Sequence, residues 1–200
     1  FQENCGIRVQ GGNYVRGRYN PNGGLPFSKY SFRLYFRGDY GPSMLNFQFF
    51  EGAEVKVFDR ITLRAGMNDH SNPFVVDEIV RRMQIATGNV GSHGNFVNLF
   101  INGEYKGYYN ATERIDDDFM RSWHGGDNGW DVIAQFGEIR EGDATAWNRM
   151  RSVVSRDQTN TSNYRRSLLE LDMDNFIDYL LVNVYSGTGD WPHNNWRAAR

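Results

Sequence analysis

The sequence predicts an α+β fold in which a strand-rich first lobe precedes a mainly helical second lobe. Two observations lead to this prediction. Up to about residue 114 the chain consists of short segments in which apolar and polar residues alternate, with one helical pattern at about 73–87. From residue 115 onward the apolar residues recur at helical spacing. We therefore expect lobes at 1–114 and 115–200, together forming one incomplete domain.

The clearest strand signal lies in Tyr30–Arg37, where every second side chain is apolar and falls on one face. These apolar residues are Tyr30, Phe32, Leu34 and Phe36. Two more segments, Gly6–Gln10 and Val55–Leu63, have the composition of strands. The first lobe is therefore expected to contain a sheet.

A β-hairpin is expected later in the same lobe, with strands at Phe96–Ile101 and Tyr105–Thr112. Asn102-Gly103 separates the two apolar runs. An Asn-Gly pair in this position is a strong turn signal, because both residues tolerate a positive φ.

The single helix of the first lobe is predicted at about 73–87. Asn72 is a suitable N-cap and Pro73 suits the first helical position. Asp77 and Glu78 lie near the positive end of the helix dipole, where acidic residues are favourable.

Three helices are predicted in the second lobe, at Asp143–Val154, Tyr164–Leu171 and Asp174–Ser186. A polar loop at 188–195 then leads into a strand at Trp196–Arg200. Because the chain stops inside that strand, we expect the lobe to be truncated at its C-terminus.

Composition limits the classes of function. The 200 residues carry a net charge of −2, which gives no electrostatic reason to expect nucleic acid or an acidic membrane as a partner. No apolar run approaches the roughly 20 residues that span a bilayer. The single cysteine, Cys5, cannot form an internal disulfide, and four scattered histidines argue against a zinc site.

The loop at 188–195 holds the strongest catalytic candidate. Phosphoryl transfer needs a carboxylate that orients or deprotonates the acceptor hydroxyl, and kinases place it in an Asp-x-x-x-x-Asn segment whose Asn binds metal. Asp190 and Asn195 have this spacing. Two further copies lie within predicted helices, where residues five apart do not share a face. They are Asp143/Asn148 and Asp178/Asn183. The alternative is a solvated turn in which Asp190 bonds its own backbone.

A cation is needed to neutralise nucleotide phosphates, and the chain has three lysines. Lys106 adjoins the hairpin turn and is expected to be solvated. Lys56 lies in the strand before the first helix, where strand counting places a kinase lysine. Lys29 begins a strand and shares its face with Arg33, so the two could hold phosphates together. The alternative for each is an exposed strand charge.

Three further parts of a kinase nucleotide site also have candidates in this sequence: the helix glutamate, the glycine-rich turn and the adenine-binding segment. Glu78 could hold the lysine from the helix, although its position near the helix N-terminus needs no partner. Gly11 and Gly12 could let backbone N–H groups approach a phosphate, or form a plain turn. Glu113 and Arg114 follow the hairpin, where a kinase chain meets adenine, or form a surface ion pair.

Seven segments, in order along nearly the whole chain, resemble the CotH kinase family, which is named for a bacterial spore-coat protein. They are Ser28–Tyr35, Leu63–Asp69, Asp77-Glu78, Phe100–Tyr109, Glu113–Asp116, Asn175–Tyr179 and Asp190–Trp196. The Ile-Asn-Gly-Glu-Tyr hairpin and the Asp-Trp-Pro…Asn-Asn loop are the most specific of them.

The resemblance implies an atypical protein-kinase-like, two-lobe fold that binds ATP with Mg²⁺ or Mn²⁺ and phosphorylates serine or threonine on secreted or coat proteins. It favours Lys29 over Lys56 as the phosphate-binding lysine, with Glu78 as its helix partner. It implies Asp190 as the catalytic aspartate, and Asn195 or Asn194 as a metal ligand. An extracellular, cell-surface or spore-coat location follows from the resemblance alone.

Two other functions stay open. One is a catalytically inactive module for binding, adhesion or coat assembly, and the other is a small-molecule kinase on the same fold. Kinase-like enzymes also need a second metal-binding aspartate on a later strand or turn, which we expect after Arg200. The residue types at positions 29, 78, 190 and 195 favour an active enzyme, since a degenerate site would be free to lose them.

Overall fold

The computed structural model describes residues 1–11, 29–66, 75–126 and 129–200. The chain forms two compact units. The first comprises Phe1–Arg82 and Gly91–Arg114, and the second comprises Met83–Val90 and Ile115–Arg200. Helices and antiparallel sheets occur together, which confirms the predicted α+β class. The kinase-like two-lobe arrangement stays a prediction.

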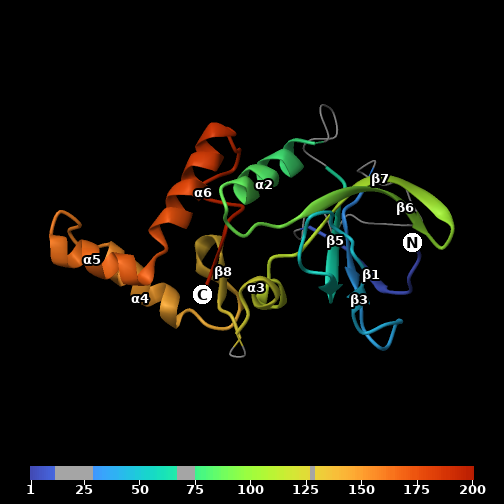
Figure 1. The fold of residues 1–200 in the computed structure, drawn as a ribbon, viewed down its shortest axis with the longest axis horizontal. Coiled ribbons are helices and arrows are strands. Elements are labelled where there is room, and N and C mark those ends of the chain that lie inside the picture. The colour runs from blue at the N-terminus through green and yellow to red at the C-terminus, as the bar shows by residue number, and fades with distance from the viewer. Residues whose placement is uncertain (12–28, 67–74, 127–128) are drawn as a thin grey trace. The chain divides into compact units, whose positions relative to one another are not determined.

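The first unit is built on a five-stranded antiparallel sheet (Figure 1). In sheet order its strands are β1 (Gly6–Val9), β2 (Phe32–Tyr35), β5 (Arg60–Arg64), β7 (Glu104–Thr112) and β6 (Gly94–Ile101). A second, two-stranded sheet pairs β3 (Leu45–Asn46) with β4 (Val57–Phe58). The strand expected at Val55–Leu63 is therefore two strands, because the chain changes partner from β3 to β2 at Asp59.

One face of the five-stranded sheet forms the core of this unit. Ile61 and Ala111 are fully buried and Leu63 is 2% exposed. Burying one such Ile or Leu contributes roughly 1.5–3 kcal/mol. The Tyr109 hydroxyl donates a hydrogen bond to the Tyr30 carbonyl at 2.9 Å, so this buried aromatic side chain leaves no polar atom unpaired.

The opposite face of the sheet is polar, and the strand register places its side chains in a row. Directly opposed residues on neighbouring strands point to the same face. From β1 to β7 the row reads Arg8, Arg33, Thr62 and Thr112. Arg33, one of the charged residues that the sequence singled out, lies on this face.

The β6–β7 hairpin confirms the turn predicted from Asn102-Gly103. Asn102 has φ 51° and Gly103 has φ 83°, the positive values that a tight hairpin turn requires. The two strands pair along their whole length, with one irregularity between Leu99 and Phe100.

Helix α2 (Val76–Ala86) confirms the helix predicted at about 73–87 (Figure 1). Asp77 and Glu78 occupy its first turn, as expected. The predicted N-cap Asn72 and Pro73 lie outside the described residues. Residues 76–82 of this helix belong to the first unit and 83–86 to the second.

The second unit contains four more helices and a three-stranded sheet within its described part. The helices are α3 (Asp117–His124), α4 (Thr145–Val154), α5 (Thr161–Glu170) and α6 (Met173–Tyr185). The strands are β8 (Val132–Ala134), β9 (Glu138–Glu141) and β10 (Arg197–Ala199), in the order β10-β8-β9. A short 3₁₀ turn, η1 (Gln135–Gly137), joins β8 to β9.

The three helices predicted in this region are confirmed as α4, α5 and α6, and the final strand is confirmed as β10. Helix α5 begins three residues earlier than expected, at Thr161, because the Asn160 side chain accepts hydrogen bonds from the next turn and acts as the N-cap. Asp172 caps α6 in the same way by accepting from the Asn175 N–H at 3.0 Å. Helix α3 and the β8–β9 hairpin were not predicted.

Candidate active site

The loop after α6 places Asp190 and Asn195 in matching backbone conformations. Asp190 has φ 57° and Asn195 has φ 62°, and the Asn194 N–H donates to the Asp190 carbonyl at 2.9 Å. A non-glycine residue in this left-handed region costs roughly 1–2 kcal/mol, although Asn and Asp tolerate it best. Such strained residues cluster at functional sites, so both ends of the Asp-x-x-x-x-Asn segment share a property typical of such sites.

Aromatic side chains anchor this loop within its own unit. The Trp191 indole N–H donates to the Tyr179 hydroxyl of α6 at 2.8 Å, and the two rings meet edge to face. Burial raises the pKa of Tyr179. At the other end of the loop, Trp196 stacks on Trp147 of α4 with ring centroids 5.5 Å apart.

The Asp190 side chain is exposed, and its carboxylate makes no hydrogen bond or ion pair within the described part of the chain. Asp190 thus lies exposed on a turn, as the alternative has it, but its carboxylate does not bond its own backbone. The other two copies of the spacing differ. Asp178 and Asn183 both lie inside α6, as predicted. Asp143 instead precedes α4 and accepts from the Thr145 N–H at 2.6 Å, so its prediction as a helical residue was wrong.

In the first unit, Lys29 lies against the β7 strand. Its ammonium group donates to the Tyr108 carbonyl and lies 4.3 Å from the centre of the Tyr109 ring. Burial lowers the pKa of Lys29. Lys106, by contrast, pairs with Glu104 at 2.6 Å beside the hairpin turn.

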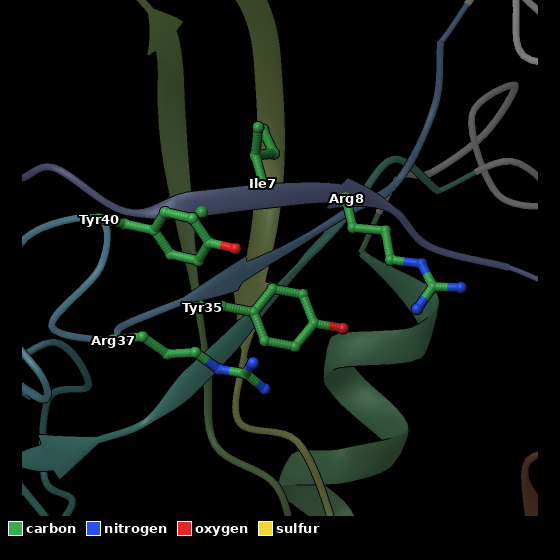
Figure 2. Close-up of a pocket in the computed structure, with 6 residues that line it drawn as sticks. Ile7, Arg8, Tyr35, Arg37 and Tyr40 are labelled. Carbon is green, nitrogen blue, oxygen red and sulfur yellow. The ribbon is translucent and has the colours of Figure 1, made fainter.

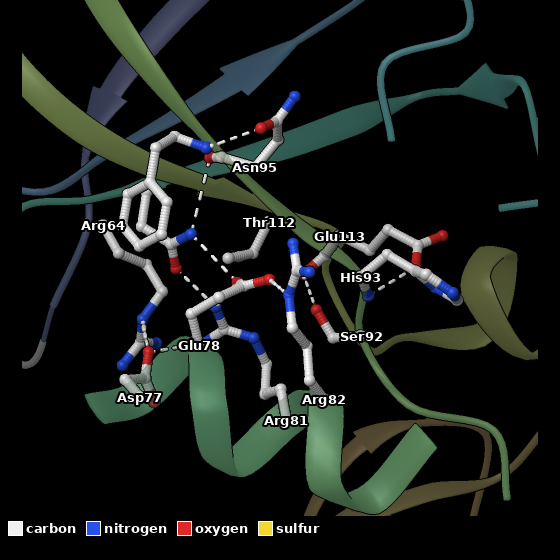
Figure 3. Close-up of polar contacts among 12 residues, drawn as sticks. Arg64, Asp77, Glu78, Arg81, Arg82, Ser92, His93, Asn95, Thr112 and Glu113 are labelled. Carbon is white, nitrogen blue, oxygen red and sulfur yellow. Dashed lines mark hydrogen bonds and ion pairs between the residues drawn. The ribbon is translucent and has the colours of Figure 1, made fainter. Parts of the chain in front are cut away.

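Glu78 is the centre of a buried polar network on α2 (Figure 3). It is only 4% exposed and pairs with Arg81 at 2.5 Å and Arg82 at 2.7 Å. It also accepts from the Asn110 amide of β7 at 3.0 Å. Lys29 is not among these partners, so the lysine–glutamate pair that the resemblance implied is absent here. The reason is local: two arginines one turn along the same helix already neutralise the carboxylate.

The protonation of Glu78 follows from these contacts. Burial acts to raise its pKa, but hydrogen bonds from Arg82, Asn110 and Arg81 outweigh burial and lower the pKa below the ordinary 4.5. A carboxyl with a lowered folded-state pKa contributes stability above its ordinary pKa, and this stability is lost as pH falls through the folded value.

We therefore expect Glu78→Gln to lower the free energy of unfolding by roughly 2–3 kcal/mol at neutral pH, because it removes the buried carboxylate that pairs with Arg81 and Arg82 and leaves Asp77 as the one acidic partner of Arg81 among the described residues. At a pH below the lowered pKa of Glu78 the wild-type carboxyl takes up a proton, so the difference should be smaller there than at neutral pH. Urea unfolding at both pH values measures this, with the exposed Glu54→Gln as control. A difference that stays the same at both pH values contradicts the assignment.

Arg33 projects from β2 on the polar face of the sheet. Its guanidinium donates to the Gln10 side chain and, at 3.1 Å, to the Tyr35 hydroxyl. Its Nε atom is buried without a hydrogen-bond partner among the described residues. Burial lowers the pKa of Arg33. A buried donor without a partner is uncommon and marks a place where a ligand could supply an acceptor.

The remaining first-unit candidates lie as follows. Gly11 adopts φ 134°, a conformation that L side chains rarely take, and Gly12 lies outside the described residues. Glu113 is 5% exposed and accepts from the His93 backbone N–H at 2.9 Å, with the His93 ring 3.0 Å away. The alternative of a surface ion pair for Glu113 is therefore wrong, because its carboxylate is buried.

A cluster of three consecutive aspartates at the start of α3 was missed by sequence reasoning, although the run itself was a visible signal. Carboxylate oxygens of Asp116, Asp117 and Asp118 lie within 4.8 Å of one another, a spacing that could hold a cation. Asp116 caps α3 by accepting from the Phe119 N–H at 3.2 Å. Asp117 and Asp118 both pair with Arg121, at 2.8 and 3.0 Å, so these charges already have partners.

Comparison with known families decides the class of this chain. A sequence model of the family described as CotH kinase protein matches residues 12–198. The chain belongs to the CotH kinase family. A search of curated proteins finds no match.

Membership in the CotH kinase family supports a kinase-like function for this chain. This family implies ATP with a divalent metal as cofactors, and a protein as substrate. Within the described residues, no helix has the length and apolar character needed to cross a membrane.

Proposed function

We propose that this CotH-family chain is an ATP-dependent phosphotransferase that phosphorylates serine or threonine hydroxyls of proteins, with Asp190 as the catalytic aspartate. The observation that carries the proposal is the unbonded Asp190 carboxylate, presented on an anchored loop in a chain whose family is kinase-like. We further propose secreted or coat proteins as substrates, and an extracellular, cell-surface or spore-coat location.

In this proposal the Asp190 carboxylate accepts a hydrogen bond from the acceptor hydroxyl and receives its proton as the oxygen attacks the γ-phosphorus. The bond between γ-phosphorus and the bridging oxygen breaks, and ADP leaves. Asn195, or Asn194, would supply an amide oxygen to the divalent ion, Mg²⁺ or Mn²⁺. That ion, when bound, neutralises charge on the phosphates.

On the first unit, we propose that Lys29 and Arg33 bind ATP phosphates. Arg33 has a buried Nε without a partner among the described residues, and Lys29 is a partly desolvated cation that lies against β7. We propose that Glu78 supports the nucleotide site by holding α2 on β7 through Asn110. Its role would then be to fix the helix rather than to pair with Lys29.

Three further residues complete the proposed nucleotide site. Gln10, which accepts a hydrogen bond from Arg33, directly precedes Gly11, so we propose that the Gly11 backbone N–H meets the same phosphates. For Gly12, which lies outside the described residues, we propose the same role from the sequence alone. Glu113 is fixed by His93 in the segment that leaves β7, where we propose that the backbone meets adenine.

Transfer of a labelled γ-phosphoryl group from ATP to acceptor proteins tests this function. We expect label on serine or threonine when Mg²⁺ or Mn²⁺ is present and no label after chelation, because the phosphates are then left without metal. An inactive binding module would bind nucleotide or protein without transferring label. That outcome would contradict the proposal.

A further inference from the structure

An open cavity of about 360 Å³ lies beside β1, which is an edge strand of the five-stranded sheet. None of its lining residues has a role in the proposed transfer. They are Gly6, Ile7, Arg8, Tyr35, Arg37 and Tyr40 (Figure 2). The lining thus contains two cations and two phenols, and no carboxylate.

The two arginines of this cavity have no acidic partner. Neither Arg8 nor Arg37 forms an ion pair within the described part of the chain. On the nearby strand β5, by contrast, Arg60 and Arg64 each pair with an aspartate, at 2.5 Å in the case of Arg64. Arginine side chains on a concave surface without a carboxylate are suited to bind an anion from outside, since the guanidinium fork matches phosphate and carboxylate oxygens.

The strand register makes this charge arrangement unfavourable for the protein alone. Arg8 lies directly opposite Arg33 across the β1–β2 pair. Like charges at directly opposed positions destabilise a sheet. Arg33 donates hydrogen bonds to the Gln10 amide and the Tyr35 phenol, and both groups are uncharged. Neither of them offsets the repulsion between Arg8 and Arg33. Features that oppose stability in this way are expected at functional sites.

Tyr35 adds a neutral donor between the cations. Figure 2 shows its ring between Arg8 and Arg37, and the Arg37 guanidinium carbon lies 5.3 Å from the ring centre. The Tyr35 hydroxyl accepts from Arg33 at 3.1 Å, which leaves its own proton available to a ligand. Burial acts to raise the pKa of Tyr35, but the Arg33 hydrogen bond and the surrounding arginines lower it, as a positive local potential requires.

We propose that this cavity binds a phosphomonoester group, carried by a phosphorylated serine or threonine in an extended peptide. Such a group has a charge of about −1.5 to −2 at neutral pH, which matches the two guanidinium groups, whereas a carboxylate would neutralise only one. The edge of β1, which pairs only with β2 among the described residues, and the exposed side chain of Tyr40 offer a surface for the peptide beside the phosphate.

The cavity borders Arg33 of strand β2, which lies opposite Arg8 and donates to the Tyr35 hydroxyl at 3.1 Å, whereas Lys29 does not line it. Lys29 precedes this strand and Arg37 follows it. The four residues of β2, Phe32–Tyr35, lie between them. A peptide phosphate at Arg37 and a nucleotide phosphate at Lys29 would therefore bind at different places. Peptide binding requires no catalysis, so it does not depend on Asp190.

Fluorescence anisotropy with a short labelled peptide that carries one central phosphoserine tests the proposal, beside the same peptide with serine. We expect the phosphorylated peptide to bind wild-type protein at least about tenfold more tightly, from its added charge-assisted hydrogen bonds. The double variant Arg8→Gln/Arg37→Gln should lose this preference. Arg165→Gln/Arg166→Gln, which removes two exposed charges from the second unit, should keep it.

Four results would overturn the proposal. They are equal binding of the two peptides by wild type, retention of the preference by Arg8→Gln/Arg37→Gln, displacement of the phosphopeptide by ATP, and equally tight binding of inorganic phosphate. The third would assign the arginines to the nucleotide site, and the fourth would assign the cavity to free phosphate.

Thermal unfolding separates a binding defect from a folding defect. Arg8→Gln removes one of two opposed like charges, so its Tm should not fall. If the double variant does not fold, the single variant Arg37→Gln, which changes an exposed side chain, should still lower the preference for the phosphopeptide. An unchanged preference in this single variant overturns the proposal.

Discussion

Asp190→Asn is expected to lower the rate of phosphoryl transfer by about 10²–10⁴-fold, the contribution typical of a positioned general base. The amide keeps the shape of the carboxylate but cannot take the proton of the acceptor hydroxyl. Because Asp190 is exposed and makes no hydrogen bond in the described part of the chain, its loss should leave the Tm unchanged. ATP affinity should stay within about twofold, since in this account Lys29 and Arg33 bind the phosphates.

The matched control is Asp174→Asn, which changes another exposed aspartate in the same unit, in the first turn of α6. It should transfer phosphate at the wild-type rate. Steady-state kinetics and ATP titration of both variants give the comparison. Equal loss of activity in the two variants, or a lower ATP affinity for Asp190→Asn without loss of turnover, would contradict the role given to Asp190.

Gly94→Ala is expected to destabilise the protein by roughly 2–4 kcal/mol, which for a chain of this length lowers the Tm by about 4–16 °C. A β-carbon at Gly94 would lie 1.9 Å from the nearer Glu78 oxygen and 3.0 Å from Arg81. Glu78 is 4% exposed and held by three partners, so it cannot move aside without breaking the network that joins α2 to β7.

The control for this prediction is Gly38→Ala, because the added carbon there meets nothing within 4 Å. Its unfolding should match that of wild type. The double variant Gly94→Ala/Glu78→Ala removes the obstructing side chain, so its destabilisation should be smaller than the sum of the two single changes. Additive single effects, measured by denaturant unfolding, would show that the clash does not involve Glu78.

Local signals predicted much of the fold. The hairpin followed from Asn102-Gly103 and the helix α2 from its acidic first turn, and both depend on residues close in the sequence. Helix α3 was missed because its eight residues, Asp117–His124, are too short to show a clear apolar stripe. The break between β4 and β5 was missed because strand partners, rather than composition, decide it.

The candidate site was predictable only where it depends on residues close in the sequence. The position of Asp190 on a loop after a helix could be read from the sequence, and the structure has that loop. The Asn110 contact of Glu78 could not be read, because Asn110 lies on a strand 32 residues further along the chain. Likewise, the opposition of Arg8 and Arg33 depends on the β1–β2 register, which side-chain alternation alone does not fix.

The catalytic role of Asp190 is tested most directly by mass spectrometry of an acceptor protein. The acceptor is incubated with ATP and Mg²⁺, in one sample with wild-type enzyme and in a parallel sample with Asp190→Asn. The account predicts serine or threonine residues that gain a phosphoryl group with wild type only. The same phosphorylated residues at equal occupancy with Asp190→Asn, or none with a wild-type protein that binds ATP, would contradict it.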